Sequence, residues 1–79
     1  MKNCIASMPS LNISIQAQRA LGGKGVFSRI VSLDPSMTKK GCAYGIEFSC
    51  EMERDVKAVL KRERIYPSEF ISEAFGKPL

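Results

Sequence analysis

Residues 42–60 read CAYGIEFSCEMERDVKAVL, and the spacing of the apolar side chains changes halfway along this stretch. From Cys42 to Phe48 larger side chains alternate with alanine, glycine and glutamate, which is the period of a strand. Farther on, apolar residues recur three and four positions apart, which is the period of a helix. Ser49 lies at the change and is predicted to cap the helix. The stretch therefore predicts a strand over 42–48 and a helix over 50–64.

A similar strand and helix precede this stretch. Residues 2–8 are mostly apolar and predict a first strand. Ser10 or Asn12 is predicted to cap a helix that Gly22-Gly23 ends through a left-handed backbone. Residues 26–33 are rich in branched and aromatic side chains, so they predict the next strand.

The predicted element order is β-α-β-β-α, with a loop over 34–41 and a short last strand over 69–72. Two strand–helix–strand halves of this kind fold into an α+β open sheet with both helices on one face, the ferredoxin-like arrangement. We expect residues 1–79 to form a single small domain. A chain of this size has a thin core and little room for an enclosed substrate cavity of roughly 300 Å³ or more.

The composition argues against several classes of function. The chain has no histidine, which excludes a Ser-His or Cys-His nucleophile pair. Its three cysteines form no C-x-x-C pair, so we expect no zinc site, no other metal and no cofactor. No apolar run reaches the length of a signal peptide or a membrane span. We therefore expect a cytoplasmic protein with free thiols and no contact with a membrane.

Cys42 is the residue that most readily suggests chemistry. A thiol attacks or carries a group only as the thiolate, and neighbouring cations favour that form. Lys39 and Lys40 precede the cysteine by three and two residues, and Gly41 allows a close approach of the backbone, so these three are the predicted binding residues. The alternative is that Cys42 is a small buried hydrophobe at the start of a core strand. The remaining cysteines are interpreted as core-filling or incidental: Cys4 and Cys50.

No other group of side chains indicates a site. The acidic residues of the second half are interpreted as solvent and helix-end charges, without a pair placed for acid–base work: Glu47, Glu51, Glu53 and Asp55. An RNA-binding sheet needs paired aromatics among basic residues and glycines in one run, which this sequence lacks, so nucleic acid is not an expected partner. The glycines at 22–25 follow a predicted helix instead of opening one, so they do not form a phosphate loop.

The spacing around Cys42 has a further meaning. A helix and a strand lead to Pro35, which stands seven residues before Cys42, and Phe48 follows the cysteine by six. In these features residues 14–65 resemble the putative selenium/sulfur carrier protein-like family of small domains. That family places a glycine directly after its cysteine, where this chain has Ala43.

The resemblance implies carriage of sulfur or selenium as a persulfide or selenosulfide on Cys42, between a donor protein and an acceptor protein. Such a carrier needs no base, metal or cavity, so we expect a non-catalytic protein instead of an enzyme. The alternative is a protein-interaction or homo-oligomerisation module, in which an open sheet face or edge strand pairs with a partner or a second copy. The two hypotheses differ at Cys42, because only the first requires its thiol.

Overall fold

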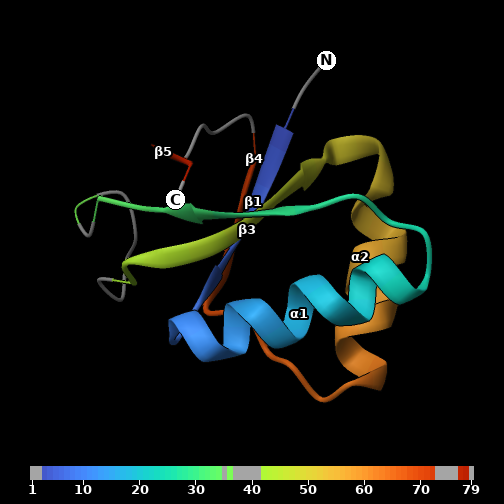
Figure 1. The fold of residues 1–79 in the computed structure, drawn as a ribbon. Helices are drawn as coiled ribbons and strands as arrows, with labels where there is room; N and C mark the ends of the chain where they lie inside the picture. Colours follow the sequence, from blue (N-terminus) through green and yellow to red (C-terminus); the bar gives the residue numbers. More distant parts are fainter. Residues whose placement is uncertain (1–2, 35, 37–41, 73–76, 79) are drawn as a thin grey trace.

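The computed structural model describes residues 3–34, 36, 42–72 and 77–78 (Figure 1). In chain order the elements are β1 (Asn3–Met8), α1 (Leu11–Gly23), β2 (Arg29–Ser32), β3 (Tyr44–Ser49), the 3₁₀ turn η2 (Cys50–Met52), α2 (Glu53–Arg62), β4 (Glu69–Ser72) and β5 (Lys77–Pro78). The predicted α+β class, an open sheet with helices, is confirmed. β5 is an addition that the sequence did not predict.

The strands form one antiparallel sheet in the order β4-β1-β3-β2-β5. Each strand–helix–strand unit, β1-α1-β2 and β3-α2-β4, has a strand of the other unit between its two strands. β1 and β3 are paired from Asn3 opposite Ser49 to Met8 opposite Tyr44. The segment that enters β3 therefore lies at the same end of the sheet as the turn that joins β1 to α1.

The main core lies between the sheet and both helices. Each helix buries apolar residues one turn apart here, at positions 17 and 21 of α1 and positions 56 and 60 of α2. Alternate residues of β1 and β3 face the helices because successive strand side chains point to opposite faces. The buried cluster comprises Cys4, Ala6, Met8, Ala17, Leu21, Val26, Ile46, Phe48, Val56, Leu60 and Ile65.

The opposite face of the sheet is also buried, around Ile5, Val31 and Leu33. Gly45 lies among these side chains. A Cβ atom at Gly45 would stand 2.8 Å from Ile5 Cγ2 and 3.0 Å from the carbonyl oxygen of Ala6. Because that oxygen belongs to the backbone of a central strand, only glycine fits at this position.

The start of α1 is as predicted, whereas the start of α2 is not. The Ser10 hydroxyl oxygen accepts a hydrogen bond from the N–H of Ile13 at 3.2 Å and so caps α1. Ser49 makes no side-chain capping bond, and η2 stands between β3 and α2. The predicted helix over 50–64 is therefore shorter, and its predicted cap is wrong. Among the described residues, no helix is long and apolar enough to cross a membrane.

The end of α1 differs from the prediction in its glycine. Gly22-Gly23 are still helical, and the left-handed residue is Gly25, with φ of 76°. The N–H of Gly25 donates to the carbonyl of Gly22 at 3.1 Å, and the N–H of Val26 donates to the carbonyl of Leu21 at 2.9 Å. This pair of bonds is a Schellman motif, which joins Val26 to the core. For that reason β2 begins at Arg29 and not at the predicted position 26.

The end of α2 repeats this motif without a glycine. The N–H of Arg64 donates to the carbonyl of Lys61 at 3.1 Å, and the N–H of Ile65 donates to the carbonyl of Leu60 at 2.9 Å. Arg64 is the left-handed residue, with φ of 58°. Leu60 and Ile65 are both buried, so the motif again fixes an apolar residue beyond the helix on the core.

Candidate functional site

Cys42 lies two residues before β3, at the end of the sheet where β1 leads into α1. Its side chain is half-buried and belongs to neither of the buried clusters that the described residues form. The thiol donates a hydrogen bond to the hydroxyl oxygen of Ser68, with a distance of 3.2 Å between Sγ and Oγ. The predicted strand over 42–48 therefore starts later, at Tyr44, and Cys42 is not the first residue of a core strand.

An open hollow of about 560 Å³ lies beside Cys42. Three segments of the described chain line it: the turn into α1, the residues that enter β3, and the residue before β4. None of the described lining residues carries a charged side chain: Pro9, Ser10, Leu11, Cys42, Ala43, Tyr44 and Ser68. The first turn of a helix presents N–H groups without intrahelical partners and the positive end of the helix dipole. The hollow beside the sulfur is therefore lined by hydroxyl groups and by the first turn of a helix, both of which can stabilise negative charge.

Ser68 is fixed on the end of β1 by backbone bonds. Its N–H donates to the carbonyl of Ser7 at 2.8 Å. The buried Ser7 hydroxyl accepts from the N–H of Glu69 at 3.1 Å and donates to the carbonyl of Glu69 at 3.3 Å. Ser68 was not among the predicted site residues. It lies 26 residues from Cys42, and only the pairing of β1 with both β3 and β4 brings the two together.

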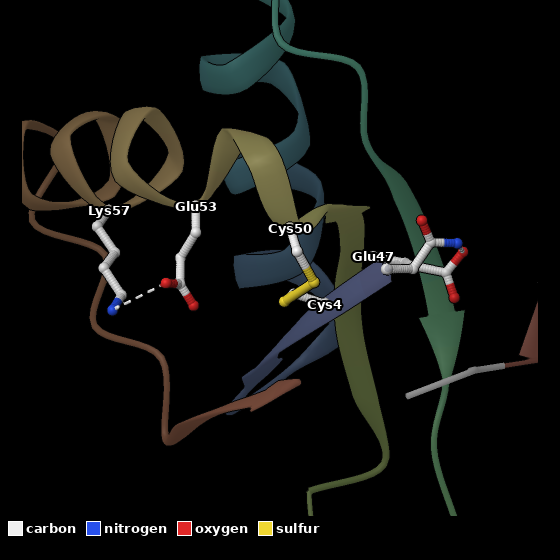
Figure 2. The surroundings of a disulfide bond; sticks show 6 residues. Cys4, Glu47, Cys50, Glu53 and Lys57 are labelled. Atoms are coloured by element: carbon white, nitrogen blue, oxygen red, sulfur yellow. Dashed lines mark hydrogen bonds and ion pairs between the residues drawn. A yellow bond between two sulfur atoms is a disulfide. The ribbon is translucent and has the colours of Figure 1, made fainter. Parts of the chain in front are cut away.

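The other two cysteines, Cys4 and Cys50, are joined in a disulfide (Figure 2). Their Cα atoms are 5.0 Å apart although 46 residues separate them in the chain. Cys4 lies in β1 opposite Phe48, and Cys50 follows β3 directly, so the β1–β3 register brings the two cysteines together. The expectation of free thiols is wrong for this pair. Cys42 is the cysteine that remains outside the disulfide.

The model of the Putative Se/S carrier protein-like family matches residues 3–72, from the first strand to the fourth. The chain belongs to this family. The resemblance seen in the sequence is thereby confirmed, and it extends over a longer stretch than residues 14–65. Neither the curated proteins nor the solved structures gave a match to this chain.

The sequence of this carrier-family protein also predicted three binding residues just before Cys42, and their positions are not described. Lys39, Lys40 and Gly41 lie outside the described residues. Within the part of the chain that is described, no group of three or more histidine, cysteine or acidic side chains could hold a metal ion.

In this Se/S carrier-like domain, Glu47 is buried, so its interpretation as a charge in contact with solvent is wrong. Its side chain is 4% exposed, on the sheet face opposite the helices. Arg29, directly across in β2, donates from Nε to Glu47 Oε1 at 2.7 Å and places a terminal guanidinium nitrogen 2.6 Å from the same oxygen. The amide of Asn3 lies 3.5 Å from that oxygen as well. A buried carboxylate needs such partners, and no sequence pattern signalled this cross-strand ion pair.

Proposed function

We propose that this protein carries sulfur or selenium on Cys42, as a persulfide or a selenosulfide. The observation that supports this most directly is the state of the three cysteines. Cys4 and Cys50 are bonded to each other, whereas Cys42 is half-buried beside an open hollow, next to a hydroxyl group. In a chain of the carrier-like family, Cys42 is then the thiol on which cargo is loaded.

Loading is a transfer between sulfur atoms that needs no oxidant. The Cys42 thiolate attacks the outer sulfur of a donor persulfide, R–S–SH. A sulfur–sulfur bond forms on Cys42, the donor's own bond breaks, and its electron pair leaves on the donor thiolate. The products are Cys42–S–SH and R–S⁻. A donor R–S–SeH gives Cys42–S–SeH in the same way, and the acceptor protein reverses the step.

The residues around Cys42 have defined roles in this proposal. A serine hydroxyl both donates and accepts, so Ser68 accepts from the thiol and, after rotation, donates to the thiolate or persulfide anion. The N-terminus of α1 favours negative charge in the adjacent hollow. Lys39, Lys40 and Gly41 are proposed to approach the same anion from the preceding loop. The partners are a sulfur donor and an acceptor protein, in the cytoplasm.

Intact mass spectrometry after incubation with a low-molecular-weight persulfide tests the proposal. We expect the protein to gain the mass of one sulfur atom, and Cys42→Ala to gain none. Ser68→Ala should load more slowly, while Ser28→Ala, at the other end of the sheet from Cys42, serves as its control. Failure of the unaltered protein to gain sulfur, or an equal gain by Cys42→Ala, would refute carriage on this residue.

A protein-interaction module is the second candidate, and specific surface features favour it. Phe27 and Tyr66 are large hydrophobic residues with exposed fractions of 85% and 70%. Among the strands that the structure describes, none pairs with the outer edge of β4. An open edge can add a strand from a second copy or a partner. Size-exclusion chromatography with light scattering measures self-association, which this candidate predicts to be unchanged in Cys42→Ser.

A further inference from the structure

We propose that the Cys4–Cys50 disulfide is a redox-controlled latch, opened by a dithiol reductant, that holds the start of α2 on the sheet. This site is separate from the one around Cys42. Cys4 is opposite Phe48, whereas Cys42 lies beyond the pair formed by Met8 and Tyr44, at the other end of β1. Four strand residues span about 14 Å, so the Cys42 thiol does not reach this disulfide in the folded chain.

The two ends of the disulfide are held very differently. Cys4 is 2% exposed and lies in β1, which pairs with β3 on one side and β4 on the other. Cys50 is half-buried and opens η2, a turn with no buried residue. Figure 2 shows the bond running from this turn to β1. Breaking the bond therefore leaves Cys4 fixed in the sheet and releases the turn.

The start of α2 has no side-chain cap that would replace the disulfide. Neither Ser49, before η2, nor Met52, before α2, makes a side-chain capping bond, in contrast to Ser10 before α1. Partly buried packing of Cys50 and Met52 on the core remains as the noncovalent anchor. An uncapped helix start frays more readily, so the disulfide decides the order of this segment.

Release of η2 would alter a surface that is suited to contacts. Ser49 and Met52 line an open hollow of about 580 Å³ together with Phe27 and Phe48, and Phe27 is 85% exposed. Met52 also lines a second hollow of about 340 Å³, between the end of α1 and α2. The redox state of one bond therefore controls the shape of both hollows.

The reaction is a two-step thiol–disulfide exchange. A thiolate of the dithiol attacks the sulfur of Cys50, which is the more exposed of the two residues, and the Cys4 sulfur leaves as a thiolate that takes a proton from water. The second thiol of the reductant then forms its internal disulfide and releases Cys50 as a thiol. The reductant loses two electrons and the protein gains them. In reducing compartments, disulfides of this kind are transient and redox-sensing.

Amide hydrogen exchange of the full chain, with and without dithiothreitol, tests the latch. The Cys42→Ser background removes the third thiol. In the reduced protein we expect residues 50–56 to exchange through local opening, about tenfold or more faster than β1 and β3, whose protection falls only with the global stability, and reoxidation should restore the slow exchange. Cys50→Ala should show the fast exchange under both conditions.

Three results would overturn the latch. One is exchange over residues 50–56 that is the same in the oxidised and reduced protein. Another is exchange over residues 50–56 that, in the reduced protein, is no faster than exchange in β1 and β3, which would mean that the disulfide acts only on the stability of the whole fold. The third is failure of Cys4 and Cys50 to form a bond on oxidation. The sulfur-loading test at Cys42 has a separate readout, so either proposal can fail while the other holds.

Discussion

Arg29 compensates a charge that the fold buries. The Glu47 carboxylate is almost inaccessible, and Arg29 is half-exposed and contacts it twice. Hydrogen bonds to charged groups contribute about 1.5–3 kcal/mol, and solvent screening around Arg29 places this pair toward the lower end. We expect Arg29→Ala to lower the free energy of unfolding by about 2 kcal/mol in urea denaturation. In a Glu47→Gln background the same change should cost less than half as much, and equal costs in both backgrounds would contradict the ion-pair account.

Ser28 is a buried residue with an unsatisfied hydroxyl. It is 7% exposed, and its Oγ has no hydrogen-bond partner among the described residues. An unsatisfied buried polar group costs about 1–3 kcal/mol, so Ser28→Ala should raise the melting temperature or leave it unchanged. Ser7→Ala is the control, because Ser7 is also a buried serine, in β1, and makes two bonds to Glu69. That change should be destabilising by about 1–2 kcal/mol. A loss of stability in Ser28→Ala would show that the hydroxyl has a partner in solution.

The two helix ends are equivalent elements with different residues at the left-handed position. Arg64 has φ of 58°, a region that costs an L-residue about 1–2 kcal/mol, whereas Gly25 has φ of 76° at no such cost. We expect Arg64→Gly to raise the free energy of unfolding by about 0.5–1 kcal/mol and Gly25→Ala to lower it by about 1 kcal/mol. A Cβ at Gly25 would meet no atom within 4 Å, so its effect is conformational. Opposite signs in chemical denaturation are the expected result, and equal signs would contradict it.

The elements that could be predicted from the sequence are those in which apolar residues recur at a regular spacing. The stripes at positions 17 and 21 and at 56 and 60 both face the core, because a helix must bury its apolar side. The residue at which each helix ends was harder to predict. Several glycines lie near the end of α1. Gly25 is the left-handed one because the N–H of Val26 donates to the carbonyl of Leu21, and this bond depends on the packing of Val26 in the core. Likewise, the burial of Glu47 follows from its cross-strand neighbour Arg29, which lies 18 residues away.

At the scale of the whole molecule, the sequence singles out Cys42 as the candidate cysteine but does not show which residues surround it. The spacing from Pro35 to Phe48 indicated Cys42, and the family match covers that region. Ser68 could not be found in this way, because a lone serine gives no signal until β4 is placed beside β1. The disulfide was missed for the same reason: it joins the first strand to the turn after the third.

The disulfide also bears on the stability of the whole molecule. It closes a loop over a sequence separation of 46 residues, for which the chain-entropy estimate is about 4 kcal/mol at 25 °C. We expect reduction with dithiothreitol in the Cys42→Ser background to lower the free energy of unfolding in urea by up to about 4 kcal/mol. The dependence on urea should steepen as well, because a chain without the crosslink exposes more surface when it unfolds. The Cys4→Ala/Cys50→Ala variant should give the same midpoint with and without reductant. If the unaltered pair behaved like this variant, the two cysteines would not be bonded in solution, and the latch and the stabilisation would both be excluded.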